Sequence, residues 1–170
     1  MVPMSSVEKA RSNMQRAQQE AQANEGKGFK TFLMKISQRA FQRSYGVPVS
    51  GMTFDGKPYL VEIGNNVPGK VISDRNLSAE KLALLDMLPD VVQNAEYVGS
   101  GEYEQHHTKQ KLTVRFDYFE TEAEIGGRQY VVSFDVEVFP NQNNYRTHRI
   151  NKIELSPALN ADPGPSARRK

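Results

Sequence analysis

The strongest constraint on the fold of this chain is a pair of alternating segments joined by two adjacent glycines. Apolar side chains recur at every second position from 112 to 118, and again from 130 to 138. Period-two alternation is typical of half-buried β-strands, and Gly126-Gly127 supplies the positive φ angles of a tight hairpin. The pattern predicts an antiparallel hairpin with one face covered by helices. The residues expected on that covered face are Leu112, Val114, Phe116, Tyr118, Tyr130, Val132, Phe134, Val136 and Val138. Arg115 and Asp117 are expected on the opposite, polar face.

Shorter signals surround this hairpin. Asp55-Gly56 is followed by alternating apolar residues from Tyr59 to Ile63, which predicts a second hairpin, and 64–76 are expected to form a loop. A last strand is predicted from Tyr145 to Leu155. Its apolar phase changes after Ile150, which indicates a β-bulge near Asn151.

Helices are predicted before and between these strands. Residues 5–24 carry a narrow stripe of mostly alanine, which favours a solvated helical arm. Residues 29–43 form a basic amphipathic pattern that either packs on the sheet or lies on an anionic lipid surface. Ser78 is placed to cap a core helix that continues to Ala95, with a break at Pro89.

Together these elements predict an α+β domain. N-terminal helices and a core helix are expected on one face of a four- to six-stranded antiparallel sheet. We expect a helical basic extension at 1–48, an α+β core domain at 49–155 and a disordered tail at 156–170. The sequence leaves open whether 1–48 belongs to the fold or is a linker, and it does not indicate the oligomeric state.

Composition removes several functional classes. The 170 residues include no cysteine, so disulfides, thiol nucleophiles and cysteine-based metal sites are excluded. No apolar run reaches the length of a membrane span, and we expect action in the cytoplasm. Net charge is +5 over 1–48 but −5 over 49–160. An acidic body argues against general DNA binding, since such proteins show a basic footprint.

All three histidines lie between Glu104 and Leu155, together with several cations. Cleavage of RNA without a metal requires a base, an acid and cations that stabilise charge on phosphorus. Histidine suits the first two tasks because its pKa lies near neutrality, and lysine or arginine suits the third. The candidate catalytic residues are His106, His107, His148, Lys109 and Arg115, and the candidate substrate-binding residues are Lys111, Thr113, Tyr145, Thr147 and Arg149.

Each of these residues also has an ordinary structural explanation. His106 and His107 fit an exposed loop, and Arg115 fits a cross-strand ion pair. Strand alternation puts His148 on the face opposite Arg149 unless the bulge reorients it. No metal-binding motif or phosphate-binding glycine loop is present, so no metal or cofactor is expected.

Residues 77–155 resemble a known family. The resemblance lies in the helix LSAEKLALLDMLPDVVQNAEYV, the hairpin LTVRFDYFETEAEIGGRQYVVSFDVEVF and a closing strand that begins at Tyr145. This pattern is similar to the large polyvalent protein-associated domains and related toxin domains of phage-derived and polymorphic-toxin proteins. These domains resemble the barnase/EndoU/colicin/RelE (BECR) class of ribonucleases.

The resemblance implies an RNA-cleaving toxin domain, with tRNA as a candidate substrate. It implies action in the bacterial cytoplasm, after delivery from another cell or a phage particle. It also implies a cognate immunity protein as a partner. Two alternatives stay open from the residues alone. One is a non-catalytic interaction domain whose acidic body docks a basic partner, and the other is a lipid-surface module formed by 29–43.

Overall fold

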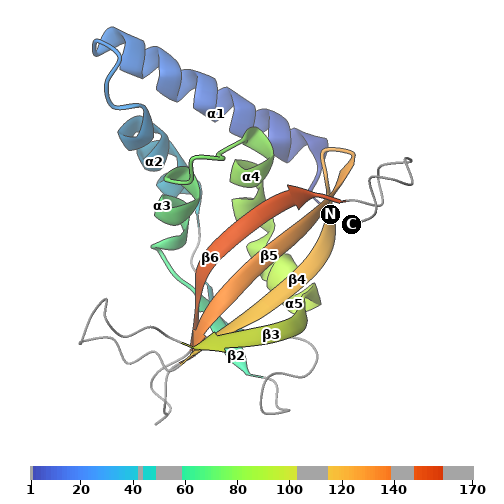
Figure 1. Cartoon of the computed structure of the whole chain (residues 1–170). Helices are drawn as coiled ribbons and strands as arrows, with labels where there is room; N and C mark the ends of the chain where they lie inside the picture. The colour runs from blue at the N-terminus through green and yellow to red at the C-terminus, as the bar shows by residue number, and fades with distance from the viewer. Residues whose placement is uncertain (1, 42–43, 49–58, 103–114, 139–147, 159–170) are drawn as a thin grey trace, which may run out of the picture.

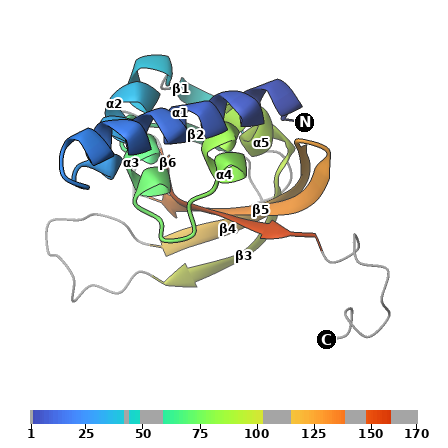
Figure 2. The ribbon, with the colours of Figure 1, turned by 90° about the horizontal axis from the view of Figure 1, so that it is seen from above.

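The computed structural model describes residues 2–41, 44–48, 59–102, 115–138 and 148–158. In these ranges one layer of helices covers one face of a six-stranded sheet, which confirms the α+β prediction (Figures 1 and 2). The helices are α1 (Met4–Ala23), α2 (Phe29–Ala40), α3 (Val67–Ile72), α4 (Ala79–Ala83), a 3₁₀ turn (Leu84–Met87) and α5 (Leu88–Asn94). The strands are β1 (Ser44–Pro48), β2 (Leu60–Ile63), β3 (Glu96–Glu102), β4 (Arg115–Ile125), β5 (Arg128–Val138) and β6 (His148–Pro157).

The strand order in the sheet is β1-β2-β6-β5-β4-β3. All neighbouring strands are antiparallel except β2 and β6, which run parallel over a short register at Val61–His148 and Glu62–Arg149. This pair joins two segments that are distant along the sequence. It therefore attaches the N-terminal hairpin β1–β2 to the β3–β6 meander.

The turn between β4 and β5 forms as predicted, but it fixes a different phase for β4. Gly126 and Gly127 have φ values of +61° and +89°, which glycine adopts without strain. This turn pairs Ile125 with Arg128, and the register that follows places Phe119 opposite Phe134. The predicted phase of β4 was therefore wrong. The covered face of β4 contains Asp117 and Phe119, while Tyr118 points outward and is 40% exposed.

Phe119 lies at the centre of the aromatic packing on the covered face. Its ring stacks on Phe134 at 5.4 Å between centroids, and Tyr97 and Tyr59 approach it edge-on at 5.8 and 6.3 Å. Edge-to-face and offset arrangements are favoured because the ring edge is positive and the face negative. This cluster holds β3, β4, β5 and the start of β2 together.

Several local predictions are confirmed and several are wrong. The Ser78 hydroxyl caps α4 by accepting a hydrogen bond from the Lys81 amide at 3.1 Å, and the core helix breaks just before Pro89. The predicted loop at 64–76 instead contains α3, because Val67, Val71 and Ile72 are buried in the core. The sequence predicts no strand at β3. Its two glycines, Gly99 and Gly101, are more typical of a turn than of a strand. Residues 49–58, with the predicted Asp55-Gly56 turn, lie outside the described ranges.

The N-terminal helices join the common core, which the sequence had left open. The alanine stripe of α1 is buried against α2 and α4, contrary to the predicted solvated arm, because small side chains allow close helix approach. On α2, Leu33 is fully buried, and Phe29, Phe32, Met34 and Ile36 pack against the same cluster. The apolar face of α2 is thus occupied by protein, which weighs against the lipid-surface alternative.

Replacing Leu33 with alanine tests this assignment. We expect Leu33→Ala to lower the free energy of unfolding by about 2–5 kcal/mol, since it leaves a cavity at a fully buried position. Urea unfolding followed by circular dichroism gives the value. The exposed neighbour Lys35 provides the control, and Lys35→Ala should change stability by less than about 0.5 kcal/mol. Equal stabilities of the two variants would show that α2 does not contribute to the cooperative core.

The predicted bulge in the last strand is confirmed. β6 shifts register between Ile150 and Lys152, so that Asn151 is the extra residue. The Lys152 amide donates a hydrogen bond to the Asp135 carboxylate at 2.9 Å, which fixes the backbone after the bulge. Burial raises the pKa of Asp135, and the hydrogen bond from Lys152 only partly offsets this effect. The ionised carboxylate is therefore disfavoured by folding.

This raised pKa predicts a pH-dependent effect of Asp135→Asn. Ionisation of the buried Asp135 carboxylate destabilises the folded state. This loss of stability is complete above the folded-state pKa of Asp135 and disappears below the ordinary aspartate pKa of about 3.9. Asparagine keeps an oxygen that accepts from Lys152 but carries no charge. Urea midpoints should be higher for Asp135→Asn than for the parent at pH 7, and the gap should close towards pH 3. A gap that widens on acidification would contradict the assignment.

Candidate functional site

A polar cluster lies on the covered face where β4 and β6 begin. At its centre is the carboxylate of Asp117, which is fully buried. It accepts hydrogen bonds from the Tyr59 hydroxyl at 2.7 Å, from the Ser100 hydroxyl at 2.6 Å and from the Arg115 Nε at 2.8 Å. We call Tyr59, Ser100, Arg115, Asp117 and His148 the strand-end cluster.

The local geometry of the strands assembles this cluster. Arg115 and Asp117 are two positions apart on β4 and therefore project from the same face of the sheet. Ser100 lies directly opposite Asp117 in the β3–β4 register. Tyr59 immediately precedes β2, and its hydroxyl reaches Asp117 from the β2 side of the same face. Three segments thus converge on one carboxylate.

Burial of a carboxylate costs free energy unless donors and an opposite charge compensate it. Asp117 receives both, because Arg115 also approaches its second oxygen through Nη2 at 3.3 Å. The pKa of Tyr59 is raised far above its usual range, first by burial and then by its hydrogen bond to Asp117. Tyr59 therefore stays protonated and acts as a donor, not as a base.

His148 joins the cluster through the ring of Tyr59. The two rings meet edge-to-face with centroids 4.6 Å apart, and His148 is half-buried at the parallel β2–β6 contact. The imidazole and the Arg115 guanidinium are thus linked through two intervening side chains, Tyr59 and Asp117. A group that can transfer a proton near neutral pH and a cation lie in one contiguous network.

Arg149 lies on the opposite face of the sheet from His148, as strand alternation predicts. It pairs across β5 and β6 with Glu137, and its Nη2 is 3.5 Å from the Glu137 carboxylate. Glu137 is 4% exposed, so this second ion pair is also largely buried on the carboxylate side. The bulge at Asn151 follows both residues and does not bring them to one face.

Of the ten predicted site residues, the described ranges include Arg115, His148 and Arg149. The strand register also shows which strand ends meet here. Glu102 pairs with Arg115, which pairs with Val138, and the β5–β6 register continues to Arg149 beside His148. The end of β3, the start of β4, the end of β5 and the start of β6 therefore lie next to one another at the strand-end cluster (Figure 1). The residues outside the described ranges are His106, His107, Lys109, Lys111, Thr113, Tyr145 and Thr147.

Sequence reasoning missed four contributors to this region: Tyr59, Tyr97, Ser100 and Asp117. The Tyr97 hydroxyl lies 2.6 Å from that of Ser100 and extends the hydrogen-bonded chain. Counting the β4–β5 register outward from Gly126-Gly127 would have placed Asp117 opposite the buried Val136. No comparable signal marked Tyr59, because it lies before a strand whose parallel partner is 87 positions away.

Comparison with known proteins identifies a family for this chain. The model of a family described as large polyvalent protein-associated domain 3 matches residues 59–148, slightly more than half of the chain. The chain belongs to this family. The matched segment begins at Tyr59 and ends at His148, the two residues whose rings meet in the strand-end cluster. No curated protein and no solved structure matched the chain.

Within the described ranges, no helix of this large polyvalent protein-associated domain is long and apolar enough to cross a membrane. In the same ranges, no group of three or more histidine, aspartate or glutamate side chains is arranged to hold a metal ion.

Removing the Asp117 carboxylate tests its central role. We expect Asp117→Ala to cost about 3–5 kcal/mol of unfolding free energy, because Arg115 and Tyr59 lose their buried partner. Chemical unfolding measures the loss. Glu120 is an exposed acid on the same strand, and Glu120→Ala should stay within about 0.5 kcal/mol of the parent. A loss below about 1 kcal/mol for Asp117→Ala would show that the network does not stabilise the fold.

Proposed function

We propose that this domain is a metal-independent endoribonuclease that cleaves RNA, with tRNA as a candidate substrate, by attack of the 2′-hydroxyl. The observation that carries the proposal is the junction of His148 and Arg115 in one network, at the sheet end where β4 and β6 begin. The resemblance to BECR ribonuclease domains supports the same reaction class.

The proposed chemistry requires only side chains. A base takes the proton of the 2′-hydroxyl, the 2′-oxygen forms a bond to phosphorus, and the bond from phosphorus to the 5′-oxygen breaks. An acid gives a proton to the departing 5′-oxygen, so that a 2′,3′-cyclic phosphate and a 5′-hydroxyl remain. His148 fills one of the two proton-transfer roles, and either His106 or His107 fills the other.

Cations stabilise the charge that develops on the phosphoryl oxygens. Arg115 is held in a fixed orientation because two of its nitrogens are bonded to Asp117. A fixed guanidinium costs no reorganisation when charge develops in the transition state. Lys109 belongs to the proposed catalytic group as well, and substrate binding is assigned to Lys111, Thr113, Tyr145 and Thr147. Arg149 is not included, because it lies on the opposite face from His148 and pairs with Glu137. A cognate immunity protein and action in the bacterial cytoplasm belong to the same proposal.

The test is cleavage of total cellular RNA by the purified chain in the presence of EDTA. We expect discrete fragments that end in 2′,3′-cyclic phosphate. His148→Ala should lower the rate by at least about 100-fold while urea unfolding stays close to that of the parent. The matched control is Arg128→Ala, which removes an exposed cation beside the β4–β5 turn and should leave cleavage unchanged.

Two outcomes would refute the proposal. One is RNA that stays intact at high protein concentration, and the other is full activity of His148→Ala. Intact RNA would favour a second candidate function, a non-catalytic interaction domain within a large polyvalent protein. The specific observation for that candidate is the outer face of β3 and β4, where exposed Glu96, Glu120 and Glu122 surround the exposed apolar Val98. Such a surface suits a basic partner.

A further inference from the structure

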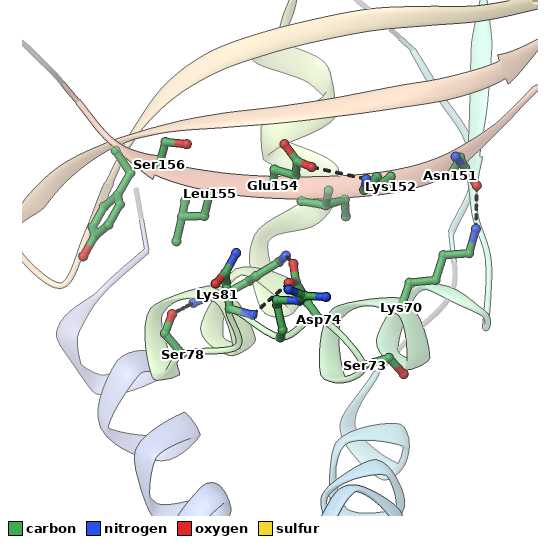
Figure 3. A pocket seen from close by; sticks show the side chains of 14 residues that line it. Lys70, Ser73, Asp74, Ser78, Lys81, Asn151, Lys152, Glu154, Leu155 and Ser156 are labelled. Carbon is green, nitrogen blue, oxygen red and sulfur yellow. Dashed lines mark hydrogen bonds and ion pairs between the residues drawn. The ribbon is translucent and has the colours of Figure 1, made fainter.

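A groove runs between β6 and the helices α3 and α4, on the far side of the bulge from His148. It encloses about 730 Å³, and Figure 3 shows the side chains that line it. The helical wall contributes Lys70, Asp74, Arg75 and Lys81, and the strand contributes residues 151–156. We call this feature the β6 groove.

The strand wall of the β6 groove is the edge of strand β6, not one of the two faces of the sheet. Six consecutive residues line it, although alternate side chains of a strand point to opposite faces. The register explains this, because β2 meets β6 only at His148 and Arg149. Beyond those two residues, within the described ranges, β6 has a strand neighbour only on its β5 side. Backbone donors and acceptors along the other edge can therefore pair with an added strand.

The charges around the groove favour an anionic ligand. Four cations, Lys70, Arg75, Lys81 and Lys152, line it with only two carboxylates. Both carboxylates are ion-paired, Asp74 with Lys81 and Glu154 with Lys152. The hydrogen bond from Lys81 lowers the pKa of Asp74, so this pair stays ionised near neutral pH.

Lys70 and Arg75 line the groove as well. Lys70 reaches across the groove and donates a hydrogen bond to the Asn151 side chain at 2.6 Å (Figure 3). Arg75 is exposed and makes no ion pair or hydrogen bond with any other described residue. A local cationic excess thus lies beside a strand edge, on a body that is otherwise acidic.

We propose that the β6 groove binds an extended acidic peptide segment of a partner protein, which adds to β6 as a further strand. The backbone of such a segment pairs with the strand edge, and carboxylates at alternate positions reach Lys70 and Arg75. Side chains on one face of a strand recur about every 6.6 Å, so residues 151–156 offer space for two or three of them. RNA fits less well, because its phosphate oxygens would face the edge carbonyl groups without donating to them.

The probe is an acetylated, fluorescein-labelled eight-residue peptide of alternating valine and glutamate, with binding followed by anisotropy. The double variant Lys70→Glu/Arg75→Glu should weaken binding at least tenfold. Lys9→Glu, which reverses an exposed cation on α1, should bind like the parent. Arg75→Glu alone should still weaken binding, which keeps the test valid if the change at Lys70 disturbs folding. His148→Ala should bind normally, so this result is independent of the ribonuclease proposal.

Hydrogen exchange supplies the structural readout. Bound peptide should slow exchange at the amides of residues 151–156, because strand addition protects the edge. The same peptide with lysine in place of glutamate should not bind. Three results would overturn the proposal. These are an acidic peptide that does not bind, an affinity that Arg75→Glu leaves unchanged, and slowed hydrogen exchange only at amides outside β6. If an oligouridylate binds, if Arg75→Glu weakens that binding, and if the peptide does not bind, the groove is an RNA site instead.

Discussion

The register set by the turn at Gly126-Gly127 is the constraint on which the rest of the structure depends. A strand register that slips by one residue exchanges its two faces, so the turn decides which side chains of β4 the helices cover. With Ile125 opposite Arg128, Phe119 meets Phe134 in the core and Asp117 meets Val136. The same register that builds the aromatic core therefore places a carboxylate beneath the helical layer.

That carboxylate is tolerated because three segments bring donors to it. Tyr59, Ser100 and Arg115 all bind Asp117, and His148 packs against the ring of Tyr59. A buried ion pair of this kind contributes little net stability compared with apolar packing, yet it specifies one arrangement of its partners. The strand-end cluster therefore fixes the positions of Arg115 and His148, and a ribonuclease mechanism requires such fixed positions.

β6 connects the two functional proposals. It begins at His148 in the strand-end cluster and continues past the Asn151 bulge into the β6 groove. The short contact with β2 explains both features, because it anchors His148 and then leaves the rest of the strand edge open. One end of the strand carries the proposed ribonuclease site, and the other carries the proposed peptide site.

The sequence by itself determined the elements with strong local signals. These are the glycine turn, the Ser78 cap, the break before Pro89, the bulge at Asn151 and the assignment of His148 and Arg149 to opposite faces. Each depends on backbone conformation or on the period of a strand, which neighbouring residues specify. Only the tertiary structure decided the phase of β4, the burial of the weak α1 stripe and the meeting of Tyr59 with His148. These features depend on contacts between residues that are distant in sequence. The free energies of such contacts cannot be inferred from the pattern of neighbouring residues.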